Sequence, residues 1–223
     1  MRNLNIDSHC HLLPAVDDGV EEIEESLAIL EEMKLKGLQR LYLTPHLFSP
    51  ISPSDPAEIM RRWHEFRFEL NNHSVEVLLG SEIFLRPEVL ESDLITMGES
   101  NFLLVELSTQ QKPHYLFEVI GKLQSTGFRI ILAHLERYHY LFKKVGLIFG
   151  KVEPTDEIHR LRDMGVLFQV NWNSLDKDSK ARVLVDRRIA DITGSDKHKQ
   201  GDNRLLIDFD DDRYRLFLND SFL

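Results

Sequence analysis

The segment SHCHLLPAVDDG, residues 8–19, combines side chains that bind metal ions. His9 and His11 are separated by one residue, and Asp17 and Asp18 follow closely. Imidazole nitrogens together with carboxylate oxygens form a common ligand set for divalent metals. Folding alone does not require this combination. The segment therefore indicates a metal site, provided that the rest of the chain supplies further ligands.

Other short apolar runs along the chain also end in ligand-type residues. They end in TPH, GSE, VEL, LAH and GSDKH, which supply His46, Glu82, Glu106, His134, Asp196 and His198. Alternate residues of a strand project to one face, so His9 with His11, or Asp196 with His198, can reach one ion. Taken singly, each residue is more often structural, and Ser195 or Asp196 would also suit a helix cap. The joint placement favours a metal cluster.

Helical patterns separate several of these apolar runs. We predict helices over 21–36, 57–71, 115–126 and 154–164, the last beginning with Pro, and three of them are followed by Gly37, Gly127 and Gly165. Alternating strands and helices imply parallel strands with crossover helices. We expect an α/β fold, a distorted TIM-like barrel of about seven strands, with a doubly wound open sheet as the alternative. Functional residues of such barrels lie at the carboxyl ends of the strands.

Length and composition narrow the protein class. The chain has 223 residues, 42% of them hydrophobic and 29% charged, which predicts one globular domain over 1–223. The net charge of −10 argues against nucleic-acid binding and against a polybasic membrane anchor. We find no apolar stretch of about 18 residues and no signal-peptide pattern, so we expect no membrane insertion and a cytoplasmic location.

The charge of the candidate cluster suits a phosphate ester. Three divalent ions carry six positive charges, and the carboxylates of Asp18, Glu82, Glu106 and Asp196 carry four negative charges, which leaves a net charge of +2. A phosphate monoester, with a charge of about −2, would balance it. Mixed histidine and carboxylate ligands favour Mn, Fe or Zn over Ca or Mg. Arg137, three residues after His134, can donate two hydrogen bonds to phosphate oxygens.

Cys10, the single cysteine, is a possible nucleophile that needs its own test. Cysteine phosphatases use a Cys-x5-Arg cradle, and Val16 occupies the arginine position here. Between two histidines that face the site, Cys10 should point into the barrel wall. We therefore expect a structural role for Cys10 and no intramolecular disulfide.

The ordered motifs resemble those of a known superfamily. DSHCHLLPAVDDG, TPH, GSE, VEL, LAHLERY, FQVNWNSL and GSDKH are similar to the series of the PHP (polymerase and histidinol phosphatase) superfamily, from Ile6 to His198. Within it they most resemble the bacterial capsular-polysaccharide tyrosine phosphatases of the CpsB/YwqE type. The resemblance implies a PHP-type (β/α)7 barrel with up to three divalent ions, usually Mn²⁺. The implied ligands are His9, His11, Asp18, His46, Glu82, Glu106, His134, Asp196 and His198.

The resemblance also implies an activity. It implies a metal-dependent protein-tyrosine phosphatase that acts on the phosphotyrosine tail of a bacterial tyrosine autokinase, in capsule and exopolysaccharide regulation. Arg137 would bind the phosphate, and His134 or His198 would protonate the leaving oxygen. The alternatives are a small-metabolite phosphatase of the histidinol-phosphate type, a phosphodiesterase, or a non-catalytic PHP-fold binding module.

Three segments depart from the family pattern. Leu135 stands where the family usually has Pro, and the segment between Ser174 and Ile189 is short. After His198 the usual arginine-containing stretch is replaced, and Arg204 is a candidate substitute for a second phosphate-binding arginine. We expect these changes to affect the substrate rim more than the metal centre.

Overall fold

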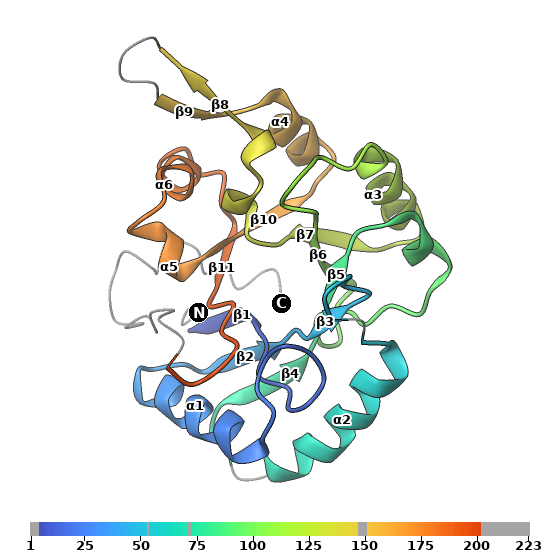
Figure 1. The fold of residues 1–223 in the computed structure, drawn as a ribbon, viewed down its shortest axis with the longest axis vertical. Helices are drawn as coiled ribbons and strands as arrows, with labels where there is room; N and C mark the ends of the chain where they lie inside the picture. The colour runs from blue at the N-terminus through green and yellow to red at the C-terminus, as the bar shows by residue number, and fades with distance from the viewer. Residues whose placement is uncertain (1–4, 53, 71–72, 147–150, 202–223) are drawn as a thin grey trace.

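The structure is a computed structural model that describes residues 5–52, 54–70, 73–146 and 151–201. Parallel strands form its centre, and helices cover them outside (Figure 1). The barrel strands are β1 (Ile6–Cys10), β2 (Arg40–Leu43), β3 (His46–Leu47), β4 (Glu76–Leu79), β5 (Glu82–Phe84), β6 (Phe102–Glu106), β7 (Arg129–Leu132), β10 (Leu167–Asn171) and β11 (Ile192–Gly194).

These strands form a closed ring. β2 and β4 pair beside β1, while their continuations β3 and β5 pair beside β6, so the chain bends once within each of two long strands. The order continues through β6, β7, β10 and β11. The ring closes where the His11 N–H donates to the Lys197 carbonyl and the Asp196 N–H donates to the His9 carbonyl, both at 2.7 Å. The predicted seven-stranded distorted barrel is confirmed, and the open sheet is wrong.

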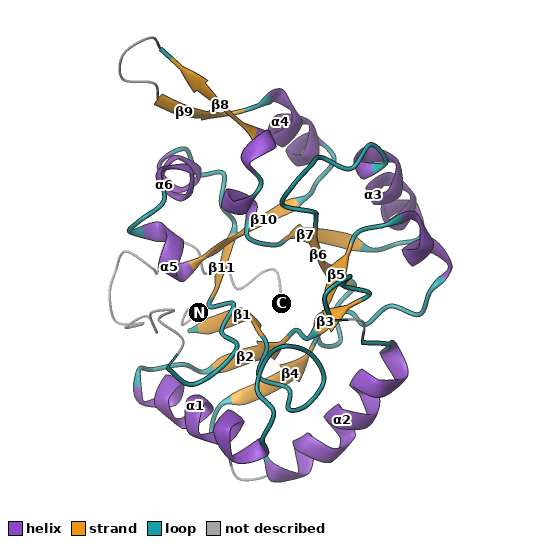
Figure 2. Cartoon of the chain, in the orientation of Figure 1, coloured by secondary structure: helices purple, strands orange, loops and turns teal. Residues whose placement is uncertain are grey.

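The helices pack outside the barrel (Figure 2). They are α1 (Ile23–Leu35), α2 (Pro56–Glu69), α3 (Leu116–Ser125), α4 (Asp156–Asp163), α5 (Trp172–Leu175) and α6 (Ser179–Asp186), with short 3-10 turns η1 (Pro87–Glu91), η2 (Leu135–Arg137) and η3 (His139–Leu141). Gly37, Gly127 and Gly165 have φ of 96°, 100° and 79°, as glycine after a helix end commonly does. Within the described residues, no helix has both the length and the apolar character to cross a membrane.

One predicted helix boundary is wrong. Pro154 does not begin a helix but ends strand β9 (Lys151–Pro154), and α4 starts at Asp156. β9 pairs with β8 (Phe142–Val145) in an antiparallel hairpin that projects from the barrel (Figure 1). The sequence did not indicate this hairpin, because exposed Lys143 and Lys144 interrupt any apolar run. The predicted role of Arg204 lies outside the described residues.

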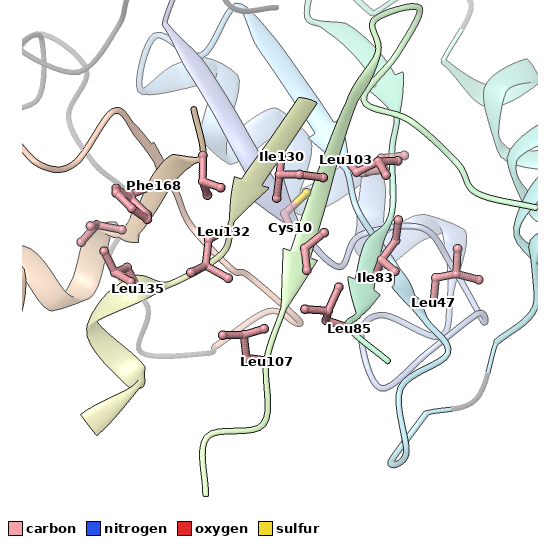
Figure 3. Packing of buried hydrophobic residues seen from close by; sticks show 14 of the residues in the cluster. Cys10, Leu47, Ile83, Leu85, Leu103, Leu107, Ile130, Leu132, Leu135 and Phe168 are labelled. Carbon is pink, nitrogen blue, oxygen red and sulfur yellow. The ribbon is translucent and has the colours of Figure 1, made fainter. Parts of the chain in front are cut away.

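Alternation along the strands divides the core into two layers. On β6, Phe102 and Leu104 belong to the interior cluster, while Val105 and Leu103 belong to the outer cluster, in which Figure 3 shows Leu103. Glu106 continues the inward set at the mouth of the barrel. Cys10 lies fully buried in the outer layer, and its thiol donates to the Tyr42 carbonyl at 3.3 Å. The predicted direction of Cys10 is therefore confirmed.

Candidate metal centre

The candidate ligands lie together at the carboxyl ends of the barrel strands. The structure brings together His9, His11, Asp18, His46, Glu82, Glu106, His134, Asp196 and His198, from β1, the loop after it, β3, β5, β6 and the ends of β7 and β11. Most of these side chains are buried, whereas Asp18 is half exposed at the opening. This is the edge at which (β/α) barrels carry their active sites.

Glu82 is the centre of the cluster. Its Oε2 atom lies 3.3 Å from the Nε2 atoms of both His9 and His11 and 3.0 Å from Nδ1 of His46. Its other oxygen lies 2.7 Å from Nε2 of His134. One carboxylate therefore touches four imidazoles, an arrangement that suits a ligand shared between neighbouring ions.

Three overlapping groups of these residues could each hold an ion. In each group the ligand atoms lie within 4.8 Å of one another: His11, Asp18, His46 and His198; His9, His11 and Asp196; and His46, Glu82 and Glu106. His134 joins them through its contact with Glu82. The number of groups matches the number of ions that the family resemblance implies.

The contacts within the cluster fit metal coordination better than hydrogen bonding. The Nε2 atoms of His9 and His11 lie 3.2 Å apart, and ligands at about 2.1 Å from one ion are separated by roughly 3.0–3.4 Å. Glu82 Oε2 and His46 Nδ1 are buried and lie 3.0 Å apart without forming a hydrogen bond, and each has a lone pair that it can donate to a metal ion. An unpaired buried polar atom costs about 1–3 kcal/mol, and a bound cation would remove that cost. The residues present therefore fit divalent ions.

Polar partners behind the cluster orient three of the histidines. Nδ1 of His11 lies 2.7 Å from Asp17 Oδ2, and Nδ1 of His9 lies 3.4 Å from Gln169 Oε1. Nδ1 of His134 lies 3.2 Å from the Tyr138 hydroxyl. In each case the contact holds the ring so that Nε2 faces the cluster, as outer partners of metal-bound histidines do.

Asp17 and Asp18 thus have different positions. Asp17 is turned away from the cleft. Its carboxylate accepts hydrogen bonds from the backbone N–H groups of Gly19 at 3.0 Å and His46 at 2.9 Å, and it also contacts His11. Asp18 lies 3.6 Å from His46 and 3.4 Å from His198 at the opening. The two neighbours therefore suit an orienting role and a ligand role respectively.

We expect Asp17→Asn to weaken manganese binding by about 10- to 100-fold, because the neutral amide orients and polarises His11 less strongly. Isothermal titration of the metal-free protein with manganese measures this. Asp55→Asn is a matched control, since Asp55 caps α2 and asparagine caps a helix equally well. Equal affinities for both variants would contradict the role of Asp17.

Two candidate ligands adopt an uncommon backbone conformation. His134 and Asp196 have φ of 31° and 52°, in the left-handed region that non-glycine residues rarely occupy. This conformation costs about 1–2 kcal/mol for each residue. Such strain is concentrated at functional sites, where it directs a side chain that a regular strand end would point elsewhere. Asp196 does not cap a helix, so that interpretation is wrong.

Arg137 lies at the edge of the cluster. Its Nη2 atom donates to Oδ2 of Asp196, which also accepts from Nδ2 of Asn171 at 2.9 Å. The guanidinium lines a cleft of about 480 Å³, together with Asp18, His46, Glu82, Glu106, Asp196 and His198. A cation therefore stands beside the candidate metal ligands, where it can donate to an anion in the cleft.

Electrostatics in the cluster favour protons at several ligand positions when no ion is bound. Burial lowers the pKa of His46, but the nearby carboxylates of Glu106 and Glu82 outweigh it and raise that pKa to about 10. Burial, with repulsion from Glu82, raises the pKa of Glu106. Burial opposes charge on His11 as well, yet Asp17 raises its pKa well above the usual value.

We therefore expect metal uptake to release protons. His46 with a pKa of about 10 is protonated at pH 7, and a metal ligand needs the nitrogen lone pair that the proton occupies. The apparent affinity for manganese should rise as the pH is raised from 6 to 9. Calorimetric titrations in two buffers of different ionisation enthalpy measure the released protons. Equal heats in both buffers would contradict this coupling.

The orienting residues have weaker signals in the sequence than the candidate ligands. Gln169 and Asn171 form a polar pair, with Gln169 Nε2 donating to Asn171 Oδ1 at 2.9 Å, and Gln169 also accepts the His134 N–H at 2.5 Å. Their signal is the alternation of polar residues in the strand FQVN. Tyr138 carries no such signal, because its partner Leu107 comes from a strand end 31 residues away.

Comparison with protein families gives one match over most of the chain. The family model described as capsular polysaccharide synthesis, CpsB/CapC, matches residues 5–205. This range contains every candidate ligand and Arg137.

Individual relatives agree with that match. Tyrosine-protein phosphatase YwqE of Bacillus subtilis is 27% identical over 205 residues, covering 86% of this chain and 77% of that protein. The crystal structures of YwqE from Bacillus subtilis and CpsB from Streptococcus pneumoniae, described as metal-dependent tyrosine phosphatases, match with a TM-score of 0.78 at 23% identity, covering 97% of this chain and 87% of the matched chain. Histidinol phosphate phosphatase of Lactococcus lactis matches with a TM-score of 0.50 at 14% identity, covering 88% and 86%. The barrel is thus shared with metal-dependent phosphatases.

Proposed function

Because the chain belongs to the CpsB/CapC family of capsular polysaccharide synthesis, we propose that it is a metal-dependent phosphate monoester hydrolase that acts on phosphotyrosine in proteins. One observation carries this proposal. Histidines and carboxylates from the strand ends meet around Glu82, and Arg137 faces the same cleft. Cations beside an arginine in a polar cleft bind and activate a phosphate ester.

The proposed cofactor is Mn²⁺, at up to three ions, with Fe or Zn as alternatives. The cluster residues around Glu82 would hold these ions, and no thiolate competes, since Cys10 faces the outer core. When bound, divalent ions at such sites activate water and neutralise charge on phosphoryl oxygens. Burial raises the pKa of the Cys10 thiol well above its usual value, which argues against a cysteine nucleophile.

The chain's own side chains divide the remaining tasks. Arg137 donates hydrogen bonds to the non-reacting phosphate oxygens and turns toward them from Asp196. Of the two candidate proton donors, His198 lines the cleft, whereas His134 is buried and does not line it. We therefore assign the leaving-group proton to His198. Phenolate, with a pKa of about 10, leaves readily and depends less on this proton than an alkoxide does.

The proposed substrate is the phosphotyrosine tail of a bacterial tyrosine autokinase that controls capsule and exopolysaccharide synthesis. Membership of a capsular polysaccharide synthesis family supports this biological setting. A cytoplasmic location and one catalytic domain over residues 1–223 belong to the same proposal. The complete set of clustered ligand candidates weighs against a non-catalytic module, which would be free to lose them.

The test compares two phosphate esters on one protein preparation. We expect the manganese-loaded protein to hydrolyse a phosphotyrosyl peptide with a kcat/KM at least tenfold above that for histidinol phosphate. Chelation should abolish both activities, and added manganese should restore them. A preference for histidinol phosphate would support the small-metabolite alternative. Failure to hydrolyse either ester after metal loading would contradict the proposed function.

A further inference from the structure

Two apolar side chains line the cleft without belonging to the hydrophobic core. Ile51 is 78% exposed, and Phe84 is partly exposed. Both border the same cleft as Glu106 and Arg137, and neither belongs to the barrel-interior cluster or the outer hydrophobic cluster. Apolar groups that contribute no core packing and face a polar site are typical of ligand contact.

Phe84 lies on β5 at the level of Glu106, beside the cluster. Ile83 and Leu85 lie in the outer core, so Phe84 faces inward like Glu82, two residues earlier on β5. Phe84 pairs in register with Glu106, one inward position nearer the opening than Glu82. Two residues of a strand advance about 6.6 Å. A phosphate held by Arg137 and the cluster would therefore place its ester substituent near the level of Phe84.

Ile51 is carried by a loop with a fixed base. The Phe48 N–H donates to the Ser54 carbonyl at 3.4 Å, and the Ser54 hydroxyl donates to the Val16 carbonyl at 2.6 Å. The second bond joins this loop to the segment that carries Asp18. Phe48 has φ of 61°, so the chain turns sharply just after His46. Bonds that hold the base of the loop lower the entropy lost when Ile51 contacts a ligand.

We propose that Ile51 and Phe84 form an apolar slot for the ring of an aryl phosphate, so that the site selects aryl over alkyl phosphate esters. This inference rests on the proposed function and adds the two side chains that recognise the aryl group. A phenyl ring has an apolar face that packs against an aliphatic side chain and an edge or face that packs against another aromatic ring. A short alkyl or a charged aliphatic substituent has no ring and buries much less apolar surface in such a slot.

Binding of two phosphonates that are not hydrolysed tests the slot without relying on turnover. We expect the manganese-loaded protein to bind phenylphosphonate about 10- to 100-fold more tightly than methylphosphonate in calorimetric titrations, as burial of a phenyl ring predicts. Ile51→Ala and Phe84→Ala should each lower this ratio by about five- to tenfold. Ile51 is exposed, so its variant should fold normally.

Leu35→Ala is the matched control, because Leu35 is 80% exposed at the end of α1 and does not line the cleft. Its ratio should equal that of the unaltered protein. An unaltered protein that binds both phosphonates equally would overturn the slot, and so would unchanged ratios in both slot variants. If neither phosphonate binds at all, the proposed phosphate site fails together with the slot.

Discussion

Replacement of Glu82 by glutamine should lower kcat/KM for a phosphotyrosyl substrate by about 1000-fold or more. Glu82 touches His9 and His11 with one oxygen and His134 with the other, so no other single side chain can replace its contacts. Glutamine removes one negative charge and places an amide N–H₂ group or a weaker oxygen ligand at this centre. Charge stabilisation by metal ions supplies several kcal/mol, and about 4 kcal/mol corresponds to three orders of magnitude in rate.

The same variant should also lose bound metal, which separates this cause from a general loss of folding. Glu76→Gln is a matched control, since Glu76 begins β4, lies on the same bent strand at the opposite end, and pairs with Arg40 at 2.7 Å. Its activity should stay within about twofold, because an exposed ion pair contributes little. Glu106→Gln should resemble Glu82→Gln. Near-normal turnover by Glu82→Gln at saturating manganese would contradict the proposed centre.

The second large effect is expected for Arg137→Ala, with a fall in kcat/KM of about 100-fold. Hydrogen bonds from a charged donor contribute about 1.5–3 kcal/mol, and about 2.7 kcal/mol is a factor of 100. Because Arg137 lines the cleft and is 39% exposed, its loss removes a phosphate contact without opening a core cavity. Inhibition by inorganic phosphate should weaken by a similar factor.

Arg137 also donates a hydrogen bond to Asp196. The Arg137→Ala variant therefore needs a measurement that separates phosphate binding from the positioning of Asp196. We expect the manganese content of Arg137→Ala to remain close to that of the unaltered protein, because Asn171 still donates to Asp196 at 2.9 Å. Arg187→Ala, which removes an exposed pair with Glu153, is the control for a lost arginine. Loss of metal with unchanged phosphate inhibition would show that Arg137 acts only through Asp196.

The barrel could be predicted from the sequence because its signals are local. Each short apolar run followed by a helical pattern defines one strand–helix unit, and parallel units of this kind have few ways to pack. The bends after Leu43 and Leu79, which divide two strands, lie beside Pro45 and Gly80, but these residues do not show that each strand continues with a new neighbour. The β8–β9 hairpin escaped prediction because exposed Lys143 and Lys144 interrupt its apolar pattern, and its contacts with α6 and α4 cannot be read from the local sequence.

The candidate site was predictable as a set of residues and much less as a geometry. The ligand candidates were identified by their residue type and their position at strand ends. The choice between Asp17 and Asp18 depended on the family resemblance. The structure gives a physical reason for choosing Asp18 as the ligand. The Asp17 carboxylate already accepts hydrogen bonds from two backbone N–H groups and contacts His11. The left-handed turns at His134 and Asp196 depend on the surrounding barrel, and no local preference of histidine or aspartate specifies them.

The measurement that tests the central claim most directly is the metal content of the purified protein, determined by mass spectrometry after manganese loading and desalting. The cluster around Glu82 predicts two to three ions for each chain, and less than one ion for Glu82→Gln prepared in the same way. Protein that retains no divalent metal after loading would contradict the metal centre and, with it, the proposed phosphatase activity.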